Sequence, residues 1–211
     1  MRITTNQKYE ITDIVHETYP FLHRIRAVRD IGSEVKKGDL GGFVEREENL
    51  SFESGDDAWI FGNAIAAGNS YVDQNACLLD EAVACDNAYI SHGAKLSGSA
   101  RAEDDAYIRG ATLKDHARAS GNSMILVSPD THLTPVLSDS CAVYGSVSGD
   151  VLVLGKAVII SGEEIRNDTL DTLVISHEGR SVMRDPSRDE LSPSVPSEEK
   201  ERAKKPREVV R

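Results

Sequence analysis

Residues 58–109 decide the fold: AWIFGN AIAAGN SYVDQN ACLLDE AVACDN AYISHG AKLSGS ARAEDD AYIR. Each six-residue unit begins with alanine, or once with serine, and an aliphatic residue or alanine follows two positions later. Because six is not a multiple of 3.6, an α-helix would turn successive alanines to different faces. In a strand, residues two apart face the same side, and Gly, Asn and Asp tolerate the left-handed backbone of a tight turn. The pattern therefore predicts short strands joined by turns.

A longer period of 18 residues lies inside the hexads. Every third unit repeats the same kind of side chain, as in Tyr71, Tyr89 and Tyr107. We call residues 18 positions apart a column. Each column keeps one side-chain size, which a flat sheet does not require and which predicts a prism with three faces. One residue is missing from the turn after Ile108, and with that slip the columns continue to Val127. We therefore predict an all-β parallel β-helix, with four coils up to that point.

The remaining segments complete the predicted domain organisation. The β-helix spans 57–162, with about five coils, and is interrupted by an extruded loop at 128–140, where Pro129 and Pro135 break the register. Residues 1–56 are interpreted as an N-terminal β cap, since a solenoid end exposes an unpaired strand edge. A terminal strand or cap is expected at 163–179. A disordered charged tail is expected at 180–211, where four of the seven prolines lie.

Composition excludes several functional classes. The chain has 211 residues and a net charge of −11, and its acidity is concentrated in the repeats, which should repel nucleic acids. No apolar run approaches the roughly 20 residues that span a bilayer, so we expect no membrane contact and a cytoplasmic protein. The three cysteines lack CxxC or zinc spacing and are interpreted as reduced and structural. They are Cys77, Cys85 and Cys141.

Two stretches resemble known proteins. IFGNAI at 60–65 and LSGSAR at 96–101 are similar to the hexapeptide repeat of left-handed parallel β-helix proteins, best known as trimeric acyltransferases and their carbonic-anhydrase-like relatives. RIRAVRD at 24–30, VKKGDLGGFVE at 35–45 and NLS at 49–51 resemble the N-terminal signature of one branch of transferase-like or polymer-forming proteins. That branch is common in phages, prophages and other mobile elements. The resemblance covers roughly residues 9–160 and implies a left-handed coil and a homotrimer.

Catalysis by the acyltransferase route would need a positioned general base, usually histidine. His92 and His116 occupy turn positions of the repeats, so we interpret them as solvated turn residues and predict no catalytic residue. No two histidines share a column at the 18-residue spacing, which argues against a metal site. No cofactor is expected.

Two groups of residues are candidates for binding. The first concentrates positive charge in the cap, where it would hold a phosphate or carboxylate; alternatively it is a solvated strand face paired with Asp30 and Glu34. This group is Arg24, Arg26, Arg29, Lys36 and Lys37. The second is predicted to point outward and to form a subunit interface. It consists of Tyr71, Tyr89, Tyr107, Trp59 and Phe61.

Three functions remain open. The leading hypothesis is a non-catalytic oligomeric β-helix that sequesters an anionic small molecule, such as a nucleotide signal, or a host partner, as a counter-defence function of a mobile element. The second is a CoA-dependent acyltransferase. The third is an acidic scaffolding protein that imitates a polyanion and occupies a nucleic-acid-binding partner.

Overall fold

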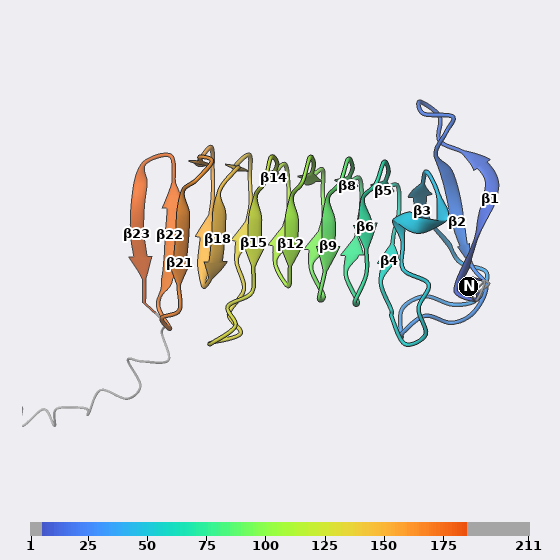
Figure 1. The fold of residues 1–211 in the computed structure, drawn as a ribbon, viewed down its shortest axis with the longest axis horizontal. Helices are drawn as coiled ribbons and strands as arrows, with labels where there is room; N and C mark the ends of the chain where they lie inside the picture. The colour runs from blue at the N-terminus through green and yellow to red at the C-terminus, as the bar shows by residue number, and fades with distance from the viewer. Residues whose placement is uncertain (1–5, 185–211) are drawn as a thin grey trace, which may run out of the picture.

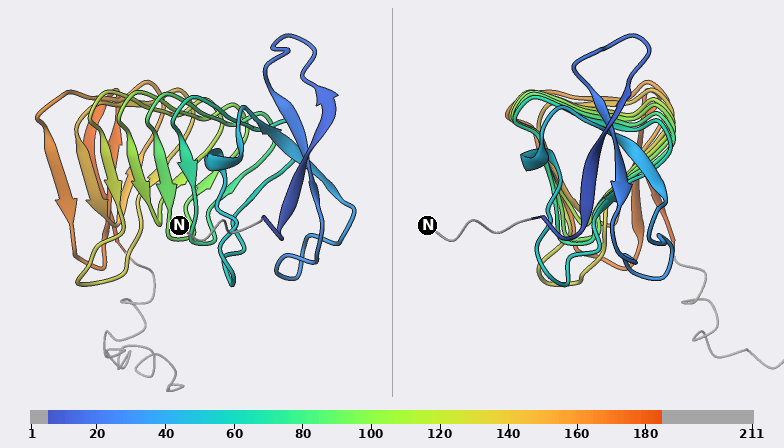
Figure 2. Two further views of the ribbon diagram at one scale, coloured as in Figure 1. Left: turned by 45° about the vertical axis from the view of Figure 1, so that its right-hand side comes forward. Right: turned by 90° about the vertical axis from the view of Figure 1, so that its right-hand side faces the viewer.

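The computed structural model describes residues 6–184, which form a parallel β-solenoid of about 7 turns (Figures 1 and 2). Three sheets enclose one core. The first sheet contains, in order, β1 (Tyr9–Val15), β2 (His23–Ala27), β3 (Leu40–Val44), β5 (Ile65–Ala66), β8 (Val83–Ala84), β11 (Arg101–Ala102), β14 (Arg118–Ala119), β17 (Ala142–Val143) and β20 (Val158–Ile159). Within residues 6–184, no helix is long and apolar enough to cross a membrane.

The other two sheets follow the same coils. The second contains β4 (Trp59–Ile60), β7 (Cys77–Leu78), β10 (Lys95–Leu96), β13 (Thr112–Leu113), β16 (Val136–Leu137), β19 (Val151–Val153), β22 (Thr172–Ser176) and β23 (Gly179–Met183). The third contains β6 (Tyr71–Val72), β9 (Tyr89–Ser91), β12 (Tyr107–Arg109), β15 (Met124–Leu126), β18 (Ser146–Gly149) and β21 (Glu164–Asn167). A short 3-10 helix, η1 (Glu47–Asn49), follows β3.

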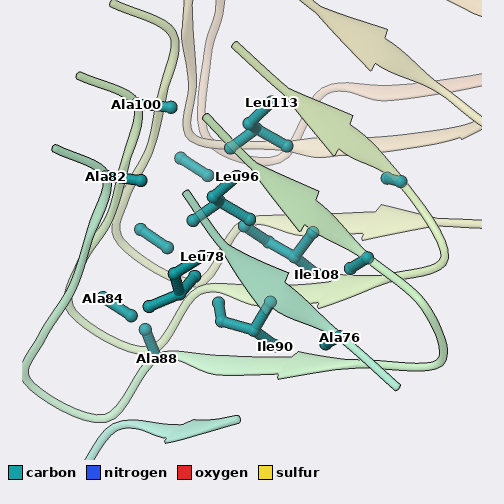
Figure 3. Close-up of a cluster of buried hydrophobic side chains, with 14 of the residues drawn as sticks. Ala76, Leu78, Ala82, Ala84, Ala88, Ile90, Leu96, Ala100, Ile108 and Leu113 are labelled. Atoms are coloured by element: carbon teal, nitrogen blue, oxygen red, sulfur yellow. The ribbon is translucent and has the colours of Figure 1, made fainter. Parts of the chain in front are cut away.

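The core confirms the predicted columns. Leu78, Leu96 and Leu113 lie in register on successive strands of the second sheet, and all three are fully buried (Figure 3). Ala84 and Ala102 pair in the first sheet, where the prism is packed by alanine. Because each column faces one corner of the prism, the width of that corner sets the side-chain size, and the alanine column keeps one size from β5 to β14 before Val143 and Ile159 replace alanine. The slip after Ile108 is also present, since strand partners there are 17 residues apart.

The turns explain the acidity of the repeats. Asp80, Asp86 and Asp104 have φ near +58°, a left-handed conformation that aspartate tolerates. The Asp80 carboxylate accepts a 2.8 Å hydrogen bond from the Gly98 amide one coil further on. The Asp104 carboxylate accepts hydrogen bonds from the Ser120 hydroxyl and the Gly121 amide of the next coil, and these lower its pKa. These carboxylates therefore join adjacent coils.

The solenoid is longer than the predicted five coils. Phe43 and Val44 in β3 pair in parallel with β5, so the first coil begins within the predicted cap at 1–56. The predicted loop at 128–140 is also too long, because β16 starts at Val136 and pairs with β13. The coil that contains β3 and the coil that contains β16 do not begin with the alanine hexad, and an insertion before β16 breaks the 18-residue period. The strand pairing of these two coils is therefore not visible in the sequence.

The C-terminal end of the described chain is a hairpin. The predicted tail begins at residue 180, but Gly179–Met183 form β23, antiparallel to β22. All five side chains of β23 are exposed, so the strand is stabilised by backbone hydrogen bonds and shows no apolar alternation. The rest of the predicted tail, 185–211, lies outside the described residues.

The N-terminal strands pack on the first coil. Trp59 has the outward register position that the sequence predicts, but it is only 1% exposed, so the predicted exposure of this residue is wrong. The side chain does leave the coil, but the Tyr9 ring covers it edge-on with centroids 6.2 Å apart. A Cβ on Gly41 would lie 2.8 Å from the Trp59 ring and 2.6 Å from Ile25. Glycine at this position therefore permits the cap to approach the solenoid.

Candidate binding face

The predicted cap cluster divides among several internal partners. Arg24 donates to the carbonyl oxygens of Gly41 (2.9 Å) and Gly62 (3.0 Å), and its guanidinium lies 4.2 Å from the centroid of the Phe43 ring. Arg26 lies on the same side of β2 but pairs with Glu10 in β1, at 3.1 Å. Although the two arginines are two residues apart on one strand, their guanidinium groups do not converge on a common point.

The remaining cap residues surround Asp30. Lys36 Nζ is 3.1 Å from one carboxylate oxygen, and the Lys37 amide donates to the other at 2.9 Å. These hydrogen bonds, that of the Lys37 amide first, lower the pKa of Asp30. Arg29 lies close enough to the buried Lys8 to lower the pKa of its amine, although burial is the larger cause. Anion binding at the cap stays a prediction.

The tyrosine ladder forms on the outer surface of the third sheet, which we call the Tyr face. The rings of Tyr71 and Tyr89 stack at 5.8 Å, and those of Tyr89 and Tyr107 at 5.1 Å. All three side chains are partly buried. The Tyr89 hydroxyl donates to Asp73 at 2.9 Å, and burial raises the pKa of that carboxyl. Phe61, the last of the predicted interface residues, packs partly against the core.

A cluster that the sequence analysis missed lies at the centre of the first sheet. Arg101 in β11 and Arg118 in β14 are directly paired neighbours. The carboxylate of Glu103 lies between them: Arg101 Nε binds one oxygen and Arg118 Nη2 the other. Glu103 is only 9% exposed, whereas each arginine side chain is 48% exposed. The hydrogen bond that Arg101 donates to Glu103 is the main cause that raises the pKa of Arg101.

The charge of this cluster is not balanced. Like charges directly opposite on neighbouring strands repel each other. Glu103 offsets that repulsion but leaves one excess positive charge. Neither guanidinium has a second partner among residues 6–184, so the other N–H groups of Arg101 and Arg118 remain available as donors. Two arginines held by one buried carboxylate can donate to a phosphate or carboxylate group.

The cluster lies on an otherwise apolar surface, which we call the Arg face: the outer side of the first sheet. Strand pairing places Ile65 and Val83 on one side of the cluster and Ala142 and Val158 on the other. Val158 is 55% exposed. The thiol of Cys85 also lies here, and burial together with Asp86 raises its pKa to about 12. This cysteine therefore stays protonated at neutral pH, which excludes it as an activated nucleophile.

The loop 16–22 between β1 and β2, here called the finger, projects beyond the prism near this face (Figure 2). His16 packs edge-on against Phe43 at 4.8 Å, and Tyr19 stacks on His16 at 5.3 Å. Tyr19 is also the smallest of the contributions that raise the pKa of Arg101, of which the hydrogen bond to Glu103 is the largest. The exposed rings of Tyr19 and Phe21 provide apolar area beside the positive charge.

The signal for the cluster was present in the sequence. With the one-residue slip after Ile108, Ile65, Val83, Arg101 and Arg118 form one outward column. The tyrosine ladder is the only outward column that the 18-residue period revealed, and in a net charge summed over a long segment the acidic turns conceal two arginines. A comparison of the outward-facing residues, column by column, would have detected the arginine pair.

His92 and His116 of the repeats lie at turns, as predicted. His92 has φ of +55°, and its Nδ1 is 3.0 Å from the Ser91 hydroxyl oxygen, while His116 is exposed after the turn at Asp115. Within residues 6–184, no group of three or more His, Cys, Asp or Glu side chains is arranged to hold a metal ion. No protein-family model and no curated protein sequence matches this chain.

Proposed function

We propose that this protein is a non-catalytic, oligomeric β-solenoid that binds an anionic small molecule, and that Arg101 and Arg118 hold the anion. The observation that carries the proposal is the pairing of two half-exposed arginines around one buried carboxylate. That arrangement leaves several N–H donors of the two arginines without a hydrogen-bond partner among residues 6–184.

Electrostatics favour this location over the rest of the surface. In a chain of net charge −11, an anion is repelled by most of the molecule and must bind where positive charge is gathered. The Glu103 carboxylate orients both guanidinium groups before the ligand arrives, which lowers the entropy cost of binding. The neighbouring apolar side chains of Ile65 and Val83 weaken screening by water.

The resemblance to proteins of mobile elements extends the proposal. A protein that binds tightly without reacting lowers the free concentration of its ligand. We therefore propose that the ligand is a molecule of the host, such as a nucleotide signal, and that sequestration is the biological activity. This part rests on the resemblance alone.

Titration with inorganic pyrophosphate tests the anion site. Arg118→Gln deletes charged hydrogen bonds worth about 1.5–3 kcal/mol each, so we expect the affinity measured by calorimetry to fall roughly tenfold or more. Lys95→Gln is the matched control, since this exposed residue of β10 carries the same charge on the second sheet. Equal loss in both variants, or no binding by the wild type, would contradict the site. Release of free CoA from acyl-CoA would contradict the non-catalytic assignment.

A further inference from the structure

The Tyr face has a central strip of apolar and aromatic side chains. Tyr71, Tyr89, Tyr107 and Met124 pair in that order along the axis. Met124 is 43% exposed. A hollow of about 400 Å³ lies beside Met124, and its lining includes Leu126, Val127 and Pro129. Such a strip, without a charge at its centre, is typical of a surface that is covered in an assembly.

At the coil of β12 the two rims of the strip carry opposite charges, while Asp73, two coils earlier in the column of Arg109, is buried. Asp105 precedes β12 and is exposed at one rim, where its carboxylate accepts a 2.8 Å hydrogen bond from Asn87. Arg109 ends β12 and is exposed at the other rim, with no ion pair among residues 6–184. At about 3.3 Å per residue, the two backbone positions lie roughly 13 Å apart, on either side of Tyr107.

Symmetry then selects one arrangement of two copies. A twofold axis parallel to the solenoid axis and passing over Tyr107 brings the two Tyr faces together and reverses the rims. Asp105 of each copy then lies opposite Arg109 of the other copy, and the two solenoids run in the same direction. The antiparallel arrangement would place aspartate against aspartate and arginine against arginine. Charge complementarity therefore favours the parallel pair.

We infer that the Tyr face binds a second copy of this chain in a parallel, twofold pair, with Tyr107 at its centre and two Asp105–Arg109 ion pairs across it. Glu164 is exposed further along the same column, where the symmetry would bring it near its own copy. The contact therefore covers β6, β9, β12 and β15 and ends before β21. The pair specifies the oligomeric part of the proposed function and rests on it.

The Arg face is a poor alternative for self-association. Arg101 and Arg118 lie at its centre, so a twofold contact there would bring four guanidinium groups together around two carboxylates. That excess of positive charge opposes a second copy and favours an anion. The two faces are thus assigned different partners by their central charges.

Light scattering on the full chain tests the pair at micromolar concentration. We expect the wild type to have twice the chain mass. Arg109→Asp places like charges opposite each other at both symmetric contacts, so we expect at least tenfold weaker pairing and a monomer. Asp105→Arg combined with Arg109→Asp restores complementarity and should restore the pair. Lys95→Asp, with the same charge change on the second sheet, should leave the pair intact.

The outcomes separate this inference from the anion site. A wild-type monomer, a mass of three chains, no effect of Arg109→Asp, or a double variant that stays monomeric would each overturn the pair. Unchanged melting temperatures show that the variants fold. Pyrophosphate affinity of the monomeric Arg109→Asp variant should equal that of the wild type, because Arg101 and Arg118 lie on another face. Failure of the pair therefore leaves the anion site testable.

Discussion

At the scale of single residues, buried polar groups show how this fold uses charge. Lys8 is fully buried, and its Nζ donates to the carbonyl oxygen of Ser51 at 2.8 Å. Glu103 is nearly buried on the outside of the prism, beneath two arginines. The first group attaches the N-terminal strands to the first coil, and the second orients the donors of the proposed anion site.

Lys8 predicts how stability changes with pH. Burial, and to a smaller extent Arg29, lowers the pKa of its amine from 10.5 to about 8, although Asp56 and Asp57 oppose this. In the unfolded chain the amine keeps its proton up to about pH 10.5, so between these values the unfolded state binds more protons than the folded state. Lys8 should therefore contribute a rise in the free energy of unfolding with pH in this window, of at most about 1.4 kcal/mol per pH unit. Above about pH 9 Cys85 and Cys141 oppose this rise, because burial raises the pKa of their thiols to about 12 and about 11.

Urea unfolding at several pH values in this window measures the effect. Lys8→Met removes the titrating group and keeps most of the side-chain volume, so its stability should not rise between pH 8 and 10.5. An identical pH dependence in the variant and the wild type would exclude Lys8 as the cause.

At the scale of elements, the coils from β4 to β17 consist of two- or three-residue strands joined by turns, and the register of one coil is set by its neighbours. The turn between Ile90 and Leu96 has one residue more than the turn between Ile108 and Leu113, yet both pairs of ends lie in register. The turns therefore absorb a change in length that the strands do not.

Insertion of one residue separates these two roles. A glycine added between Arg109 and Gly110 restores the turn length of the preceding coil, so we expect a melting temperature close to that of the wild type. The same insertion between Ala88 and Tyr89 shifts each following strand residue to the opposite side and exposes Ile90, which is buried. We expect this variant to unfold at a much lower temperature or to be insoluble. Equal tolerance at both sites would contradict the register.

At the scale of the whole molecule, the cap and the solenoid form one body because β3 belongs to both. It pairs antiparallel with β2 and parallel with β5. Trp59, the only tryptophan, lies at this junction and reports on it. The Arg face and the Tyr face are different sides of the resulting prism, and the acidic turn at Asp104 and Asp105 lies between them.

Gly41→Ala tests how the two parts are joined. An added Cβ lies 2.6 Å from Ile25 and 2.7 Å from the carbonyl oxygen of Ile60, so the cap must move away from the first coil. We expect red-shifted Trp59 fluorescence and a lower melting temperature, with the circular dichroism of the solenoid retained. Gly38→Ala is a control for crowding alone, since no atom lies within 4 Å of an added Cβ there; its φ of +97° strains alanine, so the melting temperature should fall without a shift in Trp59 fluorescence. A red shift of equal size in both variants would contradict close packing at Gly41 as its cause.

The sequence by itself determined the architecture and the register of the inward columns. Residues such as Leu78, Leu96 and Ala84 each face a corner of constant width, so the need to fill that corner recurs every 18 residues and is visible as a pattern. Coils that lack the alanine hexad, and strand β23 with its exposed side chains, have no such pattern and were missed.

Only the tertiary structure decided the outward contacts. Trp59 occupies an outward register position and is buried because Tyr9 and the cap cover it. Arg101, Glu103 and Arg118 meet because a single missing residue aligns β14 with β11. An inward side chain is constrained by the repeating prism itself. An outward one is constrained by whichever segment packs over it, and that segment follows no period in the sequence.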